Sequence, residues 1–475
     1  MTDNIQSNNH GFTPDEAETL PVIEVLDEDN RLRSQYVDQV HDCLDEDDNE
    51  QIYRLVQPLH TADIADLFEL TPRDDRGKLA LALGDLMSAD VLAEINDYVR
   101  EDIIDALPAG QVADLAAQLE TDDAVAIIED LEEDEQRAVL DILGPEDRAA
   151  IENALSYPEE SAGRIMQRDL VAAPETMTVG QLIDYLRVRS DLTTEFWEVF
   201  IVDPHYKPIG TCQLSWILRT PRSIPLGDVM KRDQSLIPVD LDQEEVALRF
   251  QKYSLISAAV VDDEGRLVGV ITADDIAHII SEEAGEDILR LSGAGEGDIN
   301  EPIIDSYKAR VRWLVANLGT AMIASFIIAQ FGAAISSMVA LAVLMPIVAS
   351  IGGNAGTQTL AVTVRALATN QLTQSNTIWA IKRELYVALS MGVSIAIIAG
   401  LGAGYFFTNP ILGAVIAAAI LCNIVIAGMS GVIIPVILDR LDQDPAVSSS
   451  IFVTMITDSM GFLLFLGLAV ASNIV

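Results

Sequence analysis

The sequence predicts a multidomain membrane protein: an acidic soluble portion of helices and two α+β units, followed by an all-α membrane domain of five helices. Two observations on charge lead to this. The net charge over 475 residues is −45, although half of the residues are hydrophobic. Residues 309–475 nevertheless hold only five acids and six bases, so almost all of the charge lies in residues 1–308. A third observation is that long uncharged stretches fill the chain after residue 312.

The acidity itself has two interpretations, which the composition leaves open. A strongly negative surface repels nucleic acid and collects cations, so no nucleic-acid partner is expected. Alternatively, the charge reflects a proteome adapted to salt, in which most proteins are acidic. The cysteines Cys43, Cys212 and Cys422 are far apart, and no HExxH motif occurs, so a thiolate or zinc site is not expected. Local groups of acids therefore carry more information than the total charge.

The uncharged stretches are long enough for five membrane helices, since one such helix needs roughly 20 apolar residues. Trp313–Val364 and Leu385–Leu438 carry no charge, and Pro445–Val475 carries only Asp458. Breaks at Phe331-Gly332 and Thr408-Asn409-Pro410 divide the first two stretches into pairs. The expected helices cover about 311–332, 336–365, 380–405, 410–438 and 447–474, within a membrane domain of residues 308–475.

The basic residues beside these helices indicate the orientation. With five spans, all of them fall on one face of the membrane, and the other face has no Lys or Arg. This pattern is typical of cytoplasmic loops. We therefore expect a multi-pass protein of the cell (inner) membrane, with its N-terminus cytoplasmic and its C-terminus on the opposite face. The bases are Arg310, Arg312, Arg365, Lys382, Arg383 and Arg440.

The soluble portion begins with a polar segment, residues 1–20, that we expect to be disordered and that has no apolar signal sequence. Residues 21–160 read as an acidic helical domain. The triplet Ala-Asp-Leu recurs at 65–67 and 113–115, and prolines separate short amphipathic segments. Short helices bury their apolar faces only against neighbouring helices, so a small superhelix is expected.

Residues 161–282 read as two copies of an α+β unit, 161–224 and 225–282. Each copy has a short strand, a turn, a second strand and a helix, with strands at 199–202 and 258–261. This arrangement resembles the tandem CBS domain. In nucleotide-binding CBS modules, residues at the positions of Thr272 and Asp275 hold a ribose, and the first copy lacks both. The resemblance leaves open whether ATP or another adenine nucleotide binds, or whether the pair serves dimerisation and ion sensing alone.

Asp458 is the only ionisable residue well inside a predicted span, where a charge costs several kcal/mol unless it faces a cavity or a partner. Thr454 and Ser450 lie one and two helical turns before it, on the same stripe of the helix. Oxygen ligands without Cys or His suit a hard cation such as Mg²⁺, which keeps much of its water shell. The alternatives are a buried hydrogen bond between helices, a protonated Asp458, or packing of small residues.

The second predicted span contains Pro346 and the segment Gly352–Gln358, which reads Gly-Gly-Asn-Ala-Gly-Thr-Gln. Gly and Pro loosen a membrane helix where backbone carbonyls line a cavity or where helices pack closely. Gly353, Asn354 and Thr357 are therefore candidates for a cation path, and close packing is the alternative. These residues indicate a path for a cation without identifying the ion.

The chain as a whole resembles the MgtE family of magnesium channels. Four features carry the resemblance, in the family's order: the acidic helical domain, the CBS pair, the segment 352–358, and Asp444-Pro445-Ala446 leading to Thr457-Asp458. The resemblance implies a homodimer whose fifth helices line a magnesium pore. It also implies that Asp458 builds the selective site, with Thr454 and Ser450 at neighbouring positions and Asn354 and Thr357 facing the pore.

The resemblance further implies a sensor that closes the channel when cytosolic Mg²⁺ bridges acids of the helical domain, the CBS pair and a connecting helix, residues 283–307. Bringing these carboxylates together costs repulsion that bound cations remove, so low magnesium favours separation and opening. For any single acid the alternative is a solvated surface charge. The implied sensor residues are Asp275, Glu283, Glu286, Asp287, Glu244, Asp122 and Asp123.

Two other functions compete with a magnesium-gated magnesium channel. One is an ion-coupled secondary transporter of divalent cations such as Mg²⁺ or Co²⁺, which the lack of an obvious inverted repeat disfavours. The other is a membrane sensor that transports nothing and works through its CBS pair, which Asp458 inside a span disfavours. An enzyme is not expected, because no nucleophile–base pair or phosphate-binding loop is recognisable.

Overall fold

The computed structural model describes residues 25–129, 131, 133–188, 196–293, 299–441 and 443–474, with the backbone alone at 287 and 448. The segment expected to be disordered, residues 1–20, lies outside the described residues. The chain divides into two compact units. The first comprises residues up to Asp240 together with Ala258–Ile271, and the second comprises Leu241–Ser257 together with Thr272 onward.

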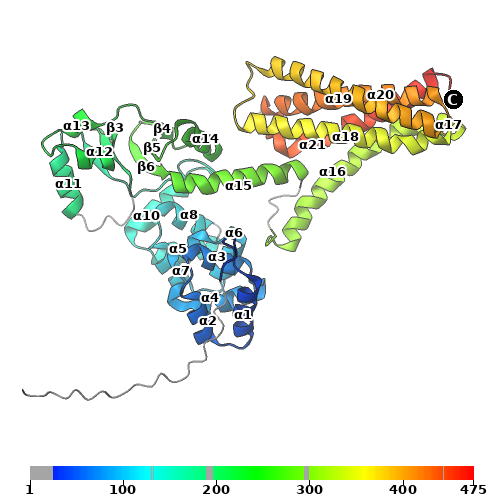
Figure 1. Ribbon diagram of the computed structural model, residues 1–475. Coiled ribbons are helices and arrows are strands. Elements are labelled where there is room, and N and C mark those ends of the chain that lie inside the picture. The colour runs from blue at the N-terminus through cyan, green and yellow to red at the C-terminus, as the bar shows by residue number, and fades with distance from the viewer. Residues whose placement is uncertain are drawn as a thin grey trace, which may run out of the picture. The chain divides into compact units, whose positions relative to one another are not determined.

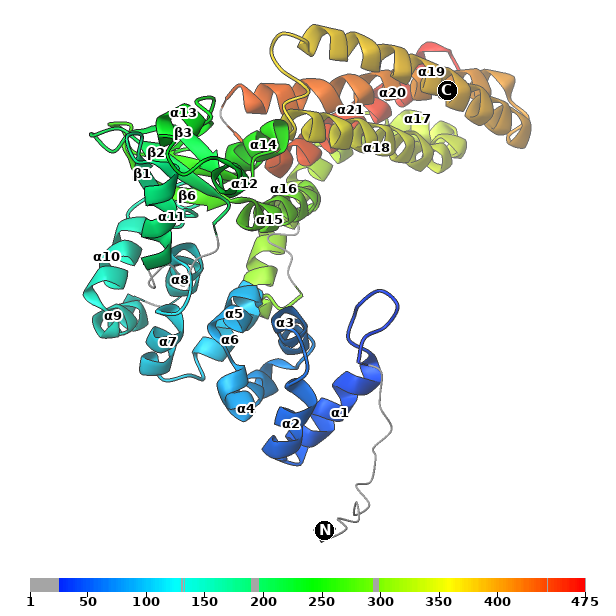
Figure 2. The same cartoon turned by 60° about the vertical axis from the view of Figure 1, so that its left-hand side comes forward.

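The first unit begins with ten short helices that stack in series (Figures 1 and 2). Most of the contacts join helices that are one or two apart in the chain, as α2 contacts α4, α3 contacts α5 and α7 contacts α9. This is the expected helical superhelix, and the prediction is confirmed. The helices are α1 (Ser34–Asp45), α2 (Asn49–Val56), α3 (Thr61–Glu69), α4 (Arg73–Leu83), α5 (Ala89–Glu94), α6 (Asp97–Ile104), α7 (Ala109–Ala116), α8 (Thr121–Glu129), α9 (Glu133–Ile142) and α10 (Pro145–Ala154), with a 3-10 turn at Gly84–Leu86.

Polar side chains start several of these helices and apolar ones join them. The carboxylate of Asp48 and the amide oxygen of Asn96 each accept a backbone N–H in the first turn of α2 and α6. Such caps satisfy N–H groups that have no partner inside the helix. Leu67 and Phe68 of α3 and Ile127 of α8 are fully buried in one continuous core. Local capping and a shared core therefore hold short helices that would not be stable alone.

One ion pair lies inside this core. The guanidinium Nη1 of Arg76, on α4, contacts Asp102 Oδ2 on α6 at 2.7 Å, and both side chains are less than a tenth exposed. Arg73 contacts the other carboxylate oxygen of Asp102 at 2.6 Å, and the Nε of Arg76 donates to the carbonyl of Thr71 at 3.1 Å. Because each charge has several partners, the pair ties α6 to α4 without leaving an isolated buried charge.

Two three-stranded sheets follow, one in each predicted repeat, and their strand orders are β1-β2-β3 and β4-β5-β6. In both sheets the first two strands are parallel. Phe200 and Val202 of the first sheet share a core with Ala259 and Leu267 of the second. The elements are β1 (Ala172–Pro174), α11 (Val179–Val188), β2 (Glu198–Val202), β3 (Pro208–Gln213), α12 (Leu214–Arg219), α13 (Leu226–Val229), β4 (Leu236–Pro238), β5 (Ser257–Val261) and β6 (Leu267–Thr272).

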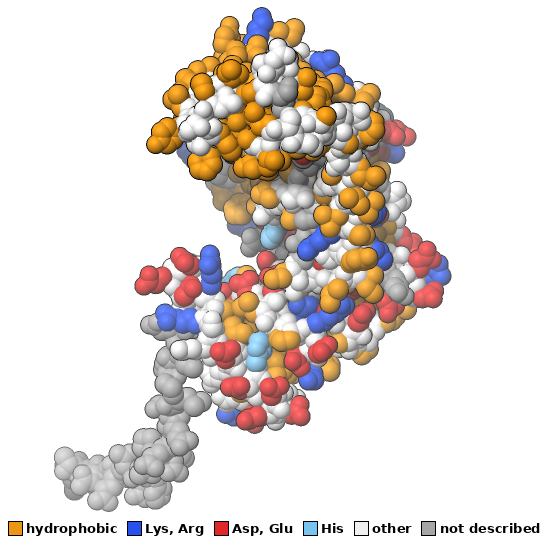
Figure 3. Space-filling model, turned by 90° about the vertical axis from the view of Figure 1, so that its right-hand side faces the viewer, with side chains coloured by type: hydrophobic (Ala, Val, Ile, Leu, Met, Phe, Trp, Pro, Cys, Tyr) orange, Lys and Arg blue, Asp and Glu red, His pale blue; other side chains and the backbone are white. Residues whose placement is uncertain are grey.

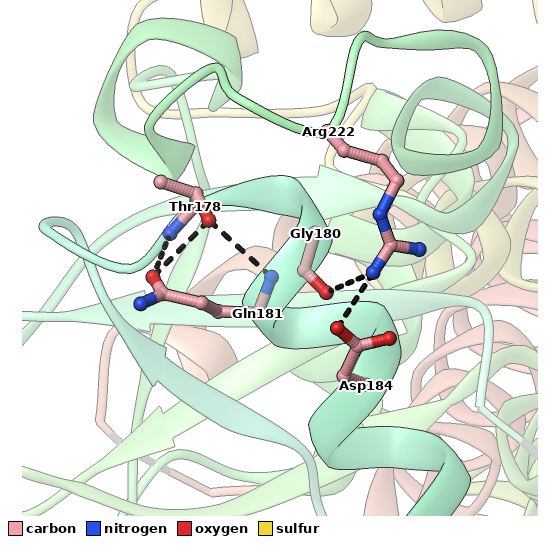
Figure 4. Close-up of polar contacts among 5 residues, drawn as sticks. All are labelled: Thr178, Gly180, Gln181, Asp184 and Arg222. Atoms are coloured by element: carbon pink, nitrogen blue, oxygen red, sulfur yellow. Dashed lines mark hydrogen bonds and ion pairs between the residues drawn. The ribbon is translucent and has the colours of Figure 1, made fainter.

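The first repeat is closed by polar contacts around the start of α11 (Figure 4). The Thr178 hydroxyl accepts from the Gln181 backbone at 3.3 Å, and the Gln181 side chain accepts from the Thr178 backbone at 2.9 Å. Arg222, far along the chain, donates to the Gly180 carbonyl at 3.0 Å and to Asp184 at 2.6 Å. The reciprocal cap sets where α11 begins, and Arg222 ties the segment before α13 to it.

The second unit contains α14 (Gln243–Tyr253) and α15 (Ala273–Ser292). A reciprocal cap between Thr272 and Asp275 starts α15, and Gly293 ends it in the left-handed conformation, with φ of 69°. The helix in this region of the structure therefore has other bounds than the connecting helix expected at 283–307. Residues 283–292 of that range belong to α15, which starts inside the range expected for the second CBS repeat, and residues 303–307 belong to the next helix, which starts at Ile303.

Five helices of this unit are long and apolar enough to cross a membrane, which confirms the predicted all-α domain with five spans. In Figures 1 and 2 α18 to α21 run side by side, and Figure 3 shows hydrophobic side chains crowding the surface over the membrane helices. The five are α16 (Ile303–Gln330), α18 (Val339–Ala368), α19 (Thr377–Phe406), α20 (Pro410–Asp439) and α21 (Pro445–Ala471), and a short helix α17 (Gly332–Ser337) joins the first two.

The buried Arg76–Asp102 pair generates a prediction for the helical domain. We expect Asp102→Ala to lower its free energy of unfolding by about 3 kcal/mol, because the buried guanidinium of Arg76 loses its main partner. The matched control is Glu50→Ala, which removes an exposed ion pair to Arg54. Such an exposed pair contributes at most about 1 kcal/mol to the free energy of unfolding. Urea unfolding of residues 25–160, followed by circular dichroism, measures both. Equal losses would show that the buried pair has no special weight.

Candidate functional site

The helix that carries Asp458 begins at a fixed position. Asp444 caps α21, with its Oδ1 accepting the backbone N–H of Ala446 at 2.7 Å, and Pro445 occupies the first turn, where it needs no donor. Ser449 donates to the Pro445 carbonyl, which tightens that turn. The short polar segment before α21 therefore sets which side chains of α21 share a face.

Two faces of α21 have opposite characters. Val453 and Thr457 are buried in the chain, and the Thr457 hydroxyl donates to the carbonyl of Thr454 at 3.1 Å. On the other face Thr454 is exposed, and Ser450 and Asp458 are partly exposed. The predicted stripe of Ser450, Thr454 and Asp458 thus lies along the surface of the single chain rather than in its core.

The second span, α18, is divided in the same way. Gly352, Gly356 and Thr359 are buried, whereas Asn354 and Thr357 are exposed and Gly353 is partly exposed. The Thr357 hydroxyl donates to the Gly353 carbonyl of its own helix at 3.0 Å. The carbonyl of Gly353 therefore accepts a hydrogen bond from Thr357, so two of the candidate residues contact each other.

Close packing places the two polar faces on neighbouring helices. A Cβ atom at Gly356 would lie 2.6 Å from Cγ1 of Val453, so only glycine lets α18 approach α21 this closely. The buried amide of Asn423, on α20, fills the space that side chains at Gly352 and Gly461 would occupy. Its Nδ2 donates to the Val348 carbonyl at 3.1 Å. These contacts fix α18 and α21 against α20 and leave their polar faces on the outside.

The third span contains a buried carboxylate, Glu384, that the sequence pattern did not indicate. Glu384 is 8% exposed, and its Oε1 accepts from the Thr359 hydroxyl of α18 at 2.8 Å. The exposed guanidinium of Arg383 lies 3.6 Å from its other oxygen. Glu384 therefore holds the buried side of the helix whose opposite side carries Asn354 and Thr357. Its place directly after Lys382 and Arg383 made it read as part of a charged helix end.

Most of the predicted sensor acids lie on α14 and α15 of the second unit. Glu283 accepts from the amide of the buried Gln243 at 2.8 Å, and Glu244 is the next residue on α14. Glu286 forms an ion pair with Arg290, one turn further along α15. The side chain of Asp287 lies outside the described part of the structure. The helices α14 and α15 therefore meet at Gln243 and Glu283, and Glu244 directly follows this contact in the sequence.

Asp275 and Thr272, the candidate nucleotide residues, are 2.6 Å apart through hydroxyl and carboxylate, in the cap of α15. Asp122 and Asp123 belong to the first unit, where both are partly buried in the first turn of α8. Among the residues that the structure describes, His, Cys, Asp and Glu do not gather in groups of three that could hold a metal ion. The predicted acids are thus spread over helix surfaces rather than assembled into a cage.

This combination of an acidic helical domain, a CBS pair and a five-helix membrane domain with an oxygen-lined polar stripe defines a class: membrane transport proteins for divalent cations. Family models agree with it. A model described as divalent cation transporter matches residues 345–468, the MgtE intracellular N domain matches 59–160, and a CBS domain matches 226–282.

The chain belongs to the MgtE family, whose members are transporters and not enzymes. It is 30% identical over 319 residues to the magnesium transporter MgtE of Enterococcus faecalis, covering 67% of this chain and 70% of that protein. Over 429 residues it is 29% identical to the magnesium transporter MgtE of Bacillus subtilis, covering 88% and 93%. The corresponding Thermus thermophilus protein is 27% identical over 436 residues, covering 90% and 97%.

Among solved structures, the chain is similar to one described as the cytosolic domain of the Mg²⁺ channel MgtE in complex with ATP. The identity is 25% and the TM-score 0.47, over 51% of this chain and 99% of that one. A second, described as the soluble part of a magnesium transporter, is 24% identical with a TM-score of 0.45, over 53% and 98%.

The Glu384–Thr359 contact generates a prediction. We expect Thr359→Val to lower the apparent melting temperature of the detergent-solubilised protein and to reduce magnesium influx, because a hydrogen bond to a charged group contributes about 1.5–3 kcal/mol. Thr363→Val is the matched control, since Thr363 is also buried on α18 but donates only to a carbonyl of its own helix, that of Thr359. Thermal unfolding and influx into liposomes measure both variants. Equal effects would show that the cross-helix bond does not matter.

Proposed function

We propose that the protein is a magnesium channel that works as a homodimer in the cell membrane, with the two copies of α18 and α21 lining the ion path. The observation that carries this proposal is the polar stripe on the outer surface of the membrane domain. Ser450, Thr454 and Asp458 form this stripe, and the neighbouring helix α18 exposes Asn354 and Thr357. Exposed polar groups at this depth need water or a partner, because lipid offers neither hydrogen bonds nor charge compensation.

A second copy supplies both. In a two-fold symmetric dimer, a surface near the axis meets the same surface of its partner, so two stripes face one another across a shared path. The two Asp458 carboxylates then form an anionic pair that binds a divalent cation. Nothing basic on the described part of α21 opposes them, since that helix carries neither Lys nor Arg.

The chemistry of the stripe favours magnesium over softer metals. All of its side-chain donors are oxygen atoms, which hard cations prefer. Mg²⁺ loses its water ligands reluctantly, and so it is bound through few carboxylates and several waters. Hydroxyl and amide groups at Thr454, Ser450 and Asn354 are suited to hold such a water shell. The backbone carbonyl of Gly353 already accepts the Thr357 hydroxyl, so Gly353 contributes by orienting that side chain.

The basic residues favour a cytoplasmic N-terminus. Arg365 lies in the last turn of α18, Lys382 and Arg383 lie in the first turns of α19, and Arg440 caps the end of α20. Together with Arg310 and Arg312 they mark a single face of a five-span protein, which is the face that remains in the cytoplasm. The opposite face then holds the C-terminus.

We further propose that intracellular magnesium closes this path by acting on the acidic helices. α15 carries six acids and a single Arg, so its approach to other acidic surfaces is opposed by repulsion. Asp275, Glu283, Glu286 and Asp287 of α15, Glu244 of α14, and Asp122 and Asp123 of α8 are the residues we assign. Cations that bind the approached arrangement more tightly shift the population toward it.

An adenine nucleotide such as ATP is a second candidate ligand of the CBS pair. The Thr272 hydroxyl lies 2.6 Å from the Asp275 carboxylate, so the two groups proposed to hold a ribose are side by side. The same contact starts α15, so a nucleotide would act at the base of the helix that carries the sensor acids. Titration of the full-length protein with ATP, followed by calorimetry, tests this assignment.

Asp458 provides the direct test of the path. We expect Asp458→Ala to abolish magnesium influx into proteoliposomes, because the selective carboxylates are gone. Asp439→Asn, at the exposed end of α20, should leave influx unchanged. An influx that survives Asp458→Ala would refute the path. An influx that requires a sodium or proton gradient would instead support a coupled transporter.

The sensor generates a further prediction. Neutralising Glu283, Glu286 and Asp287 together should raise the magnesium concentration that half-closes the channel on the order of tenfold, as coupling free energies between sites are typically 1–3 kcal/mol. Asp274→Asn, an exposed acid in the first turn of the same helix, is the control. Single-channel recording against internal magnesium measures the shift. An unchanged closing concentration in the triple variant would sink the sensor assignment.

A further inference from the structure

Arg290 lies between two carboxylates that belong to different parts of the second unit. Its Nη1 donates to Asp444 Oδ2 at 3.1 Å, and its Nη2 pairs with Glu286 on its own helix. The side chains of Arg290, Asp444 and Glu286 are 35%, 34% and 25% exposed, so the group is partly shielded from water. Arg290 is also the only Lys or Arg on α15.

The Asp444 carboxylate is shared between two tasks. Its Oδ1 caps the first turn of α21, and its Oδ2 receives Arg290. The helix it caps is the one that carries Ser450, Thr454 and Asp458. An ion pair at Asp444 therefore connects the last turn of α15 to the capping residue of the helix that lines the proposed path.

Apolar contacts place the same turn of α15 against the membrane helices. Leu291 packs on a cluster formed by Leu360 and Val364 of α18 with Ala446 and Val453 of α21. Gly293, which ends α15, lies against the indole of Trp313 on α16, where any side chain would overlap with the ring. The end of α15 is thus docked on three membrane helices, and Arg290 supplies the charged contact.

Glu286 prepares Arg290 for this contact. An acid four residues before a base on a helix is the favourable order for an ion pair. With one nitrogen of its planar fork held by Glu286, the guanidinium presents another to Asp444 at a smaller cost in side-chain entropy. Glu286 thereby acts through Arg290, in addition to any magnesium that it contacts.

We propose that Arg290 is the positioning residue that couples α15 to the pore helix, by holding the docked, closed arrangement through Asp444. This inference rests on the proposed gating function. It adds to that function a positive charge that the protein itself supplies, the Arg290 guanidinium. Magnesium relieves the repulsion between acidic surfaces, and Arg290 anchors the acidic helix where it meets α21. Without Arg290, the docked arrangement needs more magnesium to reach the same population.

The test is single-channel recording of the full-length protein in bilayers, against internal magnesium. Arg290→Gln and Asp444→Asn should each raise the half-closing concentration about three- to fivefold, the factor that a partly exposed ion pair supports. Asn still caps α21, so Asp444→Asn removes the charge and keeps the helix start. Arg290→Lys should restore part of the effect, and unitary conductance should stay unchanged in the Arg290 variants.

The double variant decides between a direct pair and two separate effects. If Arg290 and Asp444 act on each other, Arg290→Gln with Asp444→Asn shifts the closing concentration no further than either change alone. The proposal would be overturned if the two single shifts multiplied in the double variant. It would also be overturned if the variants left the closing concentration unchanged or lowered it. The control is Arg249→Gln on α14, where Arg249 pairs with Glu245 of its own helix at 2.7 Å, and it should leave gating unchanged.

Amide hydrogen exchange separates this inference from the gating proposal. In nanodiscs containing the full-length protein, the amides of residues 286–292 should exchange faster in Arg290→Gln and Asp444→Asn than in the unaltered chain. An unaltered channel that magnesium does not close would refute the gating proposal, and the exchange rates would still test the ion pair. Unchanged exchange in both variants would overturn the role of Arg290.

Discussion

A carboxylate in the middle of an apolar helix requires compensation, and the rest of the membrane domain is arranged around this requirement at Asp458. Its helix begins at a capped and proline-defined position, so Asp458 shares a face with Thr454 and Ser450. Glycine at position 356 lets α18 approach α21 closely, and α18 exposes polar residues of its own, Asn354 and Thr357. The buried sides of both helices are filled by apolar contacts and by the amide of Asn423.

The two sides of α18 and of α21 therefore have different roles. The side toward the chain's interior provides stability through close packing, the Glu384–Thr359 bond and the Asn423 amide. In the proposed ion path, the side toward the outside provides oxygen atoms for an ion and its water. Because the polar side is unsuited to lipid, the proposal is that a second copy of the chain covers it and that the ion path forms between the two copies.

Much of this could be predicted from the sequence because the signals are long-ranged and simple. The charge map, the uncharged stretches and the bases beside them predicted five spans, and the structure confirms them. The repeated strands predicted the α+β pair. The stripe on α21 followed from helical spacing alone, although spacing could not show which side of the helix faces outward. Burial of Val453 and Thr457 supplies that information.

Other features depend on contacts between distant residues, which periodicity cannot reveal. Glu384 reads as a helix-end charge until Thr359 is seen 2.8 Å away. The start of α15 is set by the Thr272–Asp275 cap, so a helix expected from 283 begins at Ala273. Arg290 and Asp444 are separated by most of the membrane domain in sequence, and only the fold brings them together.

The most direct test of the central claim is the reactivity of a cysteine at position 454 toward a membrane-impermeant thiol reagent, in a chain whose native cysteines are replaced. If the stripe lines a water-filled path, Thr454→Cys reacts, magnesium influx is blocked, and magnesium slows the reaction. A cysteine in place of Phe452, which is exposed on another side of α21, should not react. If Thr454→Cys is as inert as Phe452→Cys and influx continues, the stripe faces lipid and the proposed path is wrong.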